Sequence, residues 1–95
     1  MSKVQEAADV AVDFPQEGER ITSPGYTFRI KAMPTQAVDV AIDNGAWQSC
    51  RQAGGHWWFD WSGYKSGKHQ AIVRCRVENG KQAVMEKRHF LVALP

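Results

Sequence analysis

The feature that most constrains this chain is an alternation of apolar and polar residues with a period of two, which recurs along most of the sequence. Tyr26, Phe28 and Ile30, for example, alternate with Thr27 and Arg29. Successive side chains of a β-strand point to opposite faces of a sheet, so this pattern predicts strands with one buried face. An amphipathic helix would instead repeat its apolar positions every three or four residues.

Turn residues separate the alternating stretches at short intervals. The dipeptides Asn44-Gly45 and Asn79-Gly80 are the strongest hairpin signals, and Pro24-Gly25 and Gly54-Gly55 mark further breaks. The strands predicted between them cover residues 10–14, 26–31, 38–43, 47–51, 57–61, 69–77 and 82–94. A helix is the alternative for residues 82–94. About seven short strands with regularly spaced turns are typical of an antiparallel β-sandwich of the immunoglobulin-like class.

The length of 95 residues allows one domain. A hydrophobic content of 43% excludes a disordered chain. We expect a flexible N-terminal tail over residues 1–9 and a single β-sandwich domain over residues 10–95. Its core should include two sets of residues that share a strand face, namely Trp57, Phe59 and Trp61, and His69, Ala71, Val73, Cys75 and Val77.

Composition also bears on location and partners. No apolar run approaches the roughly 18–20 residues of a membrane-spanning helix, so no membrane partner is predicted. Residues 1–13 lack the basic start and apolar stretch of a secretory signal, which predicts a cytoplasmic location, although a domain cut from a longer protein would look the same. The net charge of +2 is too small to indicate nucleic acid. Cys50 and Cys75 are expected to be free thiols.

The spacing around the predicted Asn44-Gly45 hairpin resembles a known family. The run Val38-x-Val40-x-Ile42-Asp43-x-Gly45-x-Trp47 is similar to the central hairpin of bacterial Ig-like, early-set (E-set) domains, including the C-terminal Ig-like domain of sulfite-oxidase-type molybdenum enzymes. Trp57-x-Phe59-x-Trp61, Gly67-Lys68-His69 and Arg74-Cys75 continue the resemblance, which covers residues 12–94. An Asp common in the family is replaced by Val77. The resemblance implies a module that serves as a spacer, a dimerisation unit or an adhesion or carbohydrate-associated accessory.

The sequence provides no recognisable catalytic, cofactor or metal site. His56, His69 and His89 are scattered singly, without the paired spacing of metal ligands. No Ser occupies the strand-to-helix motif of a hydrolase nucleophile, and the Gly pairs precede strands rather than helices that would bind phosphate. We therefore predict that the chain is not an enzyme and needs no metal or cofactor.

Four charged residues fit an ion-pair interpretation better than a catalytic one. Asp39 and Asp43 lie four residues apart on one strand face, about 13 Å from each other, which is too far for a carboxylate pair of the usual glycosidase kind. In an Ig-like sandwich their strand neighbours the one that carries Arg74 and Arg76. Cross-strand ion pairs on the solvent face are therefore predicted.

One aromatic residue exceeds what the core needs. Trp58 points to the face opposite Trp57, together with Asp60, and an exposed Trp is unusual unless something covers it. Trp47 and Tyr64 are predicted to lie near it, so that Trp58, Trp47, Tyr64 and Asp60, with His56, would form an aromatic shelf for a ligand. The alternatives are a hydrophobic cluster that closes the edge of the sandwich, or a position of Trp58 beneath the acidic N-terminal tail.

Two functions remain open after these considerations. The first is a non-catalytic interaction or accessory module whose partner is a protein or a second copy of the chain, with self-association through the edge of residues 82–94. The second is a carbohydrate-binding module that uses the exposed aromatic residues. A small enzyme is the least favoured, because these spacings assemble no concave polar cluster.

Overall fold

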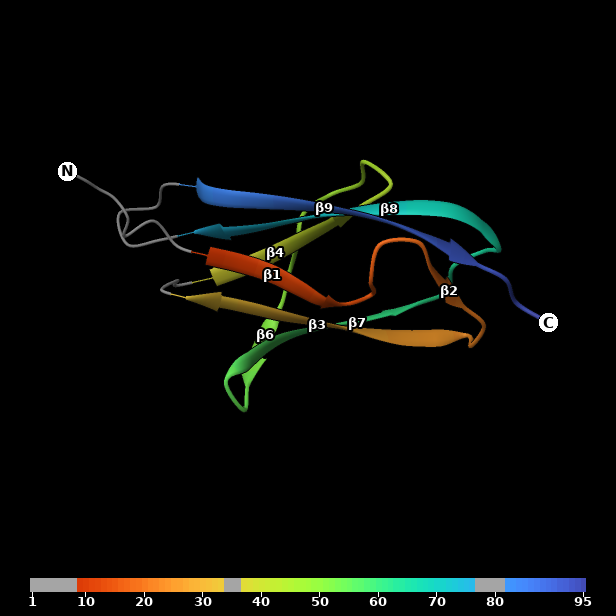
Figure 1. Ribbon diagram of the computed structural model, residues 1–95, viewed down its shortest axis with the longest axis horizontal. Coiled ribbons are helices and arrows are strands. Elements are labelled where there is room, and N and C mark those ends of the chain that lie inside the picture. The colour runs from red at the N-terminus through yellow and green to blue at the C-terminus, as the bar shows by residue number, and fades with distance from the viewer. Residues whose placement is uncertain (1–8, 34–36, 77–81) are drawn as a thin grey trace.

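The computed structural model describes residues 9–33, 37–76 and 82–95, which form two β-sheets packed face to face (Figure 1). The four-stranded sheet has the order β1 (Asp9–Phe14), β3 (Gly25–Met33), β7 (His56–Ser62), β6 (Arg51–Ala53). The five-stranded sheet has the order β2 (Glu19–Ile21), β9 (Gln82–Val92), β8 (Gly67–Arg76), β4 (Ala37–Ile42), β5 (Gln48–Ser49). Neighbouring strands are antiparallel, except that β2 runs parallel to β9. The predicted all-β sandwich is confirmed.

The strand boundaries differ from the prediction in two places. Residues 19–21 form the unpredicted strand β2, which pairs with residues 90–92. The single strand expected over residues 47–51 is instead divided at Cys50, so that β5 belongs to the five-stranded sheet and β6 to the four-stranded sheet. The Cys50 amide donates to the Val38 carbonyl of β4 at 2.8 Å, at the point where the chain leaves β5. Residues 82–92 form a strand, so the helix alternative is wrong there.

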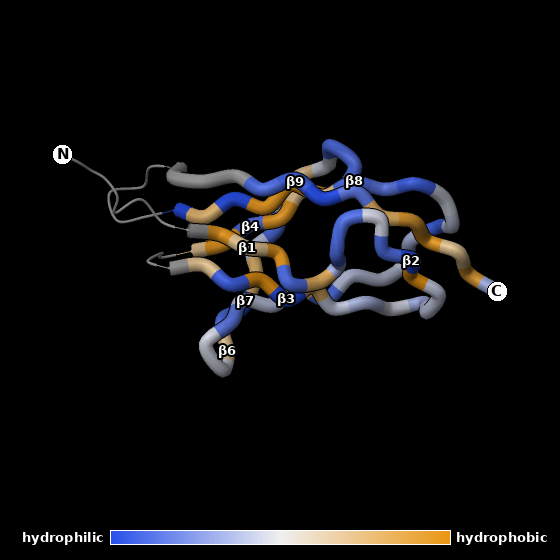
Figure 2. The backbone as a smooth tube through the Cα atoms, in the orientation of Figure 1, coloured by the Kyte–Doolittle hydropathy of each residue, from blue (hydrophilic) through white to orange (hydrophobic). Residues whose placement is uncertain are grey.

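The core lies between the two sheets and is centred on Phe28. This side chain is fully buried, and its ring contacts aromatic rings of both sheets edge to face, including Phe59 of β7 and Phe90 of β9. Ala71, Val73 and Cys75 are also fully buried, as predicted. Figure 2 shows the underlying alternation as hydrophobic and hydrophilic stretches that follow one another along the strands. Val77, the turn at Asn79-Gly80 and residues 1–8 of the predicted tail lie outside the described residues.

The hairpin predicted at Asn44-Gly45 is present, but its centre lies one residue earlier. Asp43 and Asn44 both have positive φ, at 53° and 64°, and the Gly45 amide donates to the Ile42 carbonyl at 2.9 Å. Two positive φ values are the mark of the hairpin turn whose twist matches the flanking strands, and Asp and Asn tolerate that conformation. Gly45 is required for space, because a Cβ there would lie 3.0 Å from the Ile42 carbonyl oxygen.

Charged side chains on the inner face protect the edge for which self-association was predicted. Residues 86 and 88 of β9 pair with core-facing Val73 and Ala71, so Glu86 and Arg88 point inward. Arg88 reaches across the sandwich and donates to the Val12 carbonyl of β1 at 2.9 Å. Inward-pointing charges are one of the devices by which natural sheets avoid edge-to-edge pairing. Self-association through residues 82–94 stays a prediction.

The predicted ion pairs between β4 and β8 exist at Asp39 but not at Asp43. The Asp39 carboxylate lies 3.0 Å from Nε of both Arg74 and Arg76. It is only 3% exposed, although it is on the outer face of the five-stranded sheet. Asp43 instead pairs with His69. Asp39 is therefore a buried charge whose cost is offset by two guanidinium groups.

We expect Asp39→Ala to reduce the free energy of unfolding by about 2–4 kcal/mol, because it removes the counter-charge shared by two partly buried arginines. The matched control is Asp60→Ala, which breaks a pair whose carboxylate side chain is 64% exposed. That change should cost about 0–1 kcal/mol. Urea unfolding of the three proteins measures both values. Equal losses in the two variants would contradict the buried character of the Asp39 pairs.

Candidate functional site

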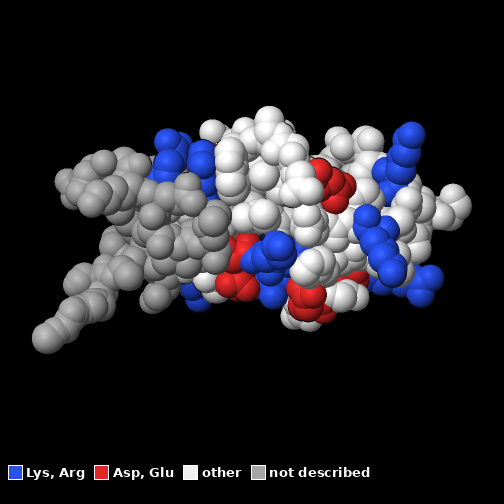
Figure 3. All heavy atoms as spheres, turned by 90° about the horizontal axis from the view of Figure 1, so that it is seen from above, with Lys and Arg blue, Asp and Glu red and all other residues white. Residues whose placement is uncertain are grey.

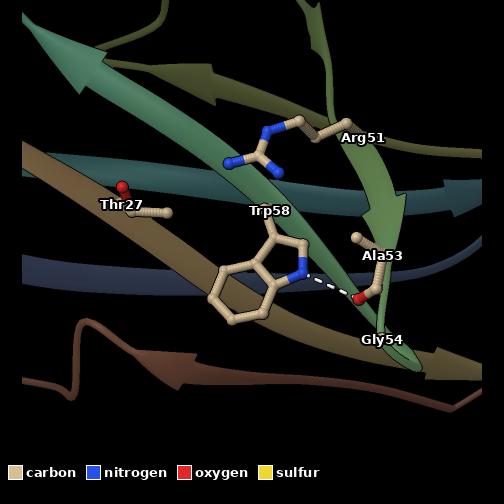
Figure 4. A pocket seen from close by; sticks show the side chains of 5 residues that line it. All are labelled: Thr27, Arg51, Ala53, Gly54 and Trp58. Carbon is tan, nitrogen blue, oxygen red and sulfur yellow. Dashed lines mark hydrogen bonds between the residues drawn. The ribbon is translucent and has the colours of Figure 1, made fainter.

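Trp58 lies on the outer face of the four-stranded sheet, where the alternation along β7 places it. Its neighbours Trp57 and Phe59 are buried on the inner face, while Trp58 is half-buried. The indole Nε1–H donates to the Ala53 carbonyl at 2.8 Å (Figure 4). This bond ties the ring to the β6–β7 hairpin, whose turn residues Gly54 and Gly55 both have positive φ. The polar edge of the indole is thus satisfied within the protein.

An open groove of about 470 Å³ lies over this ring and is lined by Thr27, Arg51, Ala53, Gly54 and Trp58. In Figure 4 the indole is seen face on, between Thr27 of β3 and Ala53 of β6, with the Arg51 side chain beyond its rim. The groove therefore has an aromatic floor and walls from three neighbouring strands. A shallow apolar floor with a few fixed polar groups is the usual composition of a binding site.

The polar rim of the groove is organised by Asp60. Its carboxylate accepts a hydrogen bond from the Thr27 hydroxyl at 2.9 Å and lies 3.3 Å from the Arg51 guanidinium. All three side chains are exposed. Their positions are therefore coupled to each other, while hydrogen-bonding capacity remains toward solvent.

The structure brings together some of the residues predicted for the aromatic shelf and separates the others. Trp58 and Asp60 share the outer face of β7, and the His56 ring lies 5.8 Å from the Trp58 ring. Trp47 belongs to the other sheet, where the Arg74 guanidinium lies over its ring at 4.1 Å, although the residue is 38% exposed. The predicted proximity of Trp47 to Trp58 is therefore wrong.

Tyr64 is also apart from the groove. Its ring stacks on Trp61 at 3.9 Å, and its hydroxyl donates to the Ser23 carbonyl at 2.6 Å. Tyr64 thus packs at the margin of the core beside Trp61 rather than beside Trp58. Thr27 was missed because β3 becomes a neighbour of β7 only through the sheet order, which no local motif encodes. Arg51 lies opposite Trp58 across the hairpin that turns at Gly54-Gly55, so that turn was the signal that could have found it.

A second hollow, of about 310 Å³, lies near the β4–β5 turn and is lined by Asp43, Asn44, Lys68, His69, Gln70 and His89. Its polar groups are already engaged. His69 contacts the Asp43 carboxylate through Nδ1 at 2.6 Å and the Lys65 carbonyl through Nε2 at 2.7 Å. The other Asp43 oxygen accepts the Gln70 amide at 3.0 Å. These bonds hold the turn against β8, so we assign this hollow a structural role.

The described residues provide no other chemical centre. No group of three His, Cys, Asp or Glu side chains suited to a metal ion occurs among them. Burial and the nearby Asp39 charge raise the pKa of the Cys50 thiol to about 12, so it is a poor nucleophile at neutral pH. Val38 lies between the two free cysteines, since it is the strand partner of Cys75 and its carbonyl accepts a hydrogen bond from the Cys50 amide. The described part of the chain also contains no helix long and apolar enough to cross a membrane.

Charge is not gathered into a continuous basic surface on the side of β8 and β9. Figure 3 views the molecule from this side and shows Lys and Arg separated by a broad stretch of uncharged residues, with acidic groups among them. Nucleic-acid binding depends on a basic patch or stripe that follows the phosphates. This face of the described structure does not offer one.

Comparison with known proteins identifies the fold but no family. No family model and no curated protein sequence matches the chain. Among solved structures, fibronectin(III)-like modules of CbhA from Clostridium thermocellum superpose with a TM-score of 0.72 at 16% identity, over 90% of this chain and 98% of theirs. The sandwich is therefore immunoglobulin-like, as predicted. None of the similarities described here supports the narrower resemblance to sulfite-oxidase-type enzymes.

Two larger enzymes contain a similar domain. An endo-β-1,4-mannanase from Thermotoga petrophila superposes with a TM-score of 0.79 at 17% identity, over 98% of this chain and 21% of that protein. A modular endo-β-1,4-mannanase from Cellulomonas fimi gives a TM-score of 0.62 at 22% identity, over 93% of this chain and 18% of that protein. The chain thus spans about a fifth of each mannanase.

The environment of His69 leads to a pH-dependent stability. Burial lowers the pKa of His69, but its hydrogen bonds to Asp43 and the Lys65 carbonyl, with the Asp43 charge, outweigh that effect and raise the pKa above 6.5. Because the folded-state pKa is above the unfolded value, the stabilisation is fully present below pH 6.5 and is lost as the pH rises through the folded-state pKa.

We therefore expect the free-energy difference between the wild type and His69→Gln to shrink as urea unfolding is repeated from about pH 5 to about pH 9. Lys68→Gln is the control, because it changes an exposed charge beside His69 without removing these hydrogen bonds. In NMR titrations Asp43→Asn should lower the pKa of His69. A difference that grows with pH would show that His69 is neutral in the folded protein.

Proposed function

We propose that this chain is a non-catalytic accessory module that binds carbohydrate through the groove over Trp58. The proposal rests on how the Trp58 indole is held and on what lies over its ring. Its N–H is bonded to Ala53, while the groove over its ring is open and bounded by a polar rim. A fixed aromatic face beside hydrogen-bonding groups is complementary to a sugar, which has an apolar C–H face and a periphery of hydroxyls.

The rim supplies the kinds of polar group that a sugar requires. The Asp60 carboxylate is an acceptor, and the Arg51 guanidinium and the Thr27 hydroxyl are donors. Since they already bond to one another, little side-chain freedom would be lost when a ligand binds. The groove is open rather than enclosing, and the residues that line it include no carboxylate; Asp60 lies beside it as the partner of Thr27 and Arg51. These features favour binding over hydrolysis.

The structural neighbours support an accessory role. Two of them are endo-β-1,4-mannanases in which the similar region is about a fifth of the chain, and a third is a fibronectin-like module. A small domain of this kind within a larger enzyme points to β-1,4-linked mannan as the first polysaccharide to test. The cytoplasmic location, a protein partner and the resemblance to the sulfite-oxidase C-terminal domain stay predictions.

We expect Trp58→Ala to weaken binding of mannohexaose or cellohexaose at least tenfold, which corresponds to about 1.4 kcal/mol. Isothermal titration calorimetry and the NMR shift of the Trp58 indole N–H would measure the effect. Trp47→Ala is the matched control, because it removes an equally large ring from the opposite sheet and should leave the affinity unchanged. If neither sugar binds the wild type, or if the two variants lose affinity equally, the groove is not the site.

A further inference from the structure

Four residues on the outer face of the four-stranded sheet stand in one line across all of its strands. Strand pairing places Phe14 of β1 opposite Arg29 of β3, Arg29 opposite Trp58 of β7, and Trp58 opposite Arg51 of β6. We call this line the cross-strand row. It runs from the residues of the Trp58 groove across β3 to the edge strand β1.

A β-bulge places Phe14 in the row. The register of β1 shifts between Val12 and Phe14, so Asp13 is an extra residue in the ladder. Without the bulge, Phe14 would share the inward face of Val12, as the plain alternation of the sequence predicts; instead it is 39% exposed and lies against Arg29. Arg88 supports this shift, because its guanidinium donates to the Val12 carbonyl beside the interruption. Bulges commonly re-aim a side chain in this way.

Both arginines of the row are held by carboxylates. Arg29 bonds to Asp13 at 3.2 Å and lies over the Phe14 ring, with its guanidinium carbon 4.7 Å from the ring centre. Arg51 pairs with Asp60 at 3.3 Å. Each positive charge therefore has a negative charge beside it, and the row as a whole is close to neutral. This balance suits an uncharged polyhydroxyl ligand better than a polyanion.

The spacing of the two rings sets the shape of that ligand. Neighbouring strands lie 4.7–4.9 Å apart, so Phe14 and Trp58, two strands apart, are about 10 Å from each other, and the whole row spans about 14 Å. In an extended, equatorially linked hexose chain, each sugar advances by nearly one strand spacing and alternate sugars present the same face. Two rings separated by one arginine thus match alternate sugars.

We propose that the cross-strand row binds a neutral, extended polysaccharide of equatorially linked hexoses, laid across the strands, with sugars stacked on Trp58 and Phe14. This inference rests on the proposed function and adds the chain type, its direction and a second contact. About four sugars would cover the row. A chain of α-linked glucose curls and cannot follow a straight line of this length.

The experiment measures dissociation constants by calorimetry for mannose and cellulose oligosaccharides of two to six sugars, with maltohexaose as the α-linked comparison. Affinity should rise up to about four sugars and then level off, and maltohexaose should bind at least tenfold more weakly than cellohexaose. Phe14→Ala should weaken hexaose binding about fivefold to tenfold and leave disaccharide binding unchanged. Trp58→Ala should weaken both.

Two further variants control for folding and position. Phe14→Tyr keeps the ring and should keep the wild-type affinity, so a loss in Phe14→Ala alone reports the missing contact. Lys31→Ala alters the same face of β3 two residues away from the row and should have no effect. One contrary result is binding that depends on Trp58 and yet does not change with Phe14→Ala, with chain length or with linkage. That result overturns the cross-strand row as the binding site but leaves the proposed function intact. Absence of Trp58-dependent binding to every sugar overturns both.

Discussion

The structure depends on the closure of two sheets over Phe28. This ring meets aromatic rings from β7 and β9 at close to right angles, so it connects the two sheets through the core. Such edge-to-face contacts add to the burial of a large apolar area and fix how the sheets are aligned. Every strand that contributes to the core must then turn its alternate residues outward. The outer faces are therefore determined by the core, and the residues found there are available for other roles.

The strand content and most of the core could be predicted from the sequence, because both follow from local periodicity and turn residues. Ala71, Val73 and Cys75 are buried as the alternation requires. The predictions that failed concern features that depend on contacts between distant segments of the chain. The chain changes sheets at Cys50, where its amide still bonds to Val38 of β4, and nothing in residues 47–51 themselves marks that point. Asp43 pairs with His69 rather than an arginine because the antiparallel register that sets Asp39 opposite Arg74 sets Ile42 opposite Ala71, which brings residue 43 beside residues 69 and 70.

The candidate site was predictable only in part, and for the same reason. Trp58 and Asp60 are two residues apart on one strand, so their shared face follows from the period of β-structure. Thr27 and Arg29 join them through strand order, Arg51 through the hairpin at Gly54-Gly55, and Phe14 through the bulge at Asp13. A bulge reverses the face of every later residue in its strand, which a pattern of alternation cannot reveal. Of the residues expected to form the shelf, Trp58, Asp60 and His56 thus lie together, whereas Trp47 and Tyr64 lie elsewhere; the binding role of the shelf stays a prediction.

A comparison of Trp47 with Trp58 shows that exposure alone does not mark a binding residue. Trp47 is one of the most exposed large apolar residues described, yet Arg74 already lies over one face of its ring and is itself tied to the buried Asp39. Trp58 is less exposed, but the protein engages its N–H edge and leaves the groove over the ring open. A ligand can stack on Trp47 only through the ring face that Arg74 does not cover. The N–H of Trp58 is already bonded to the Ala53 carbonyl, so a ligand on its ring need not supply that acceptor. The availability of a rigid, unoccupied ring face is therefore the better criterion, and it selects Trp58 as the main contact. Phe14, with Arg29 over one face of its ring, has only its other face to offer and is the weaker contact of the cross-strand row.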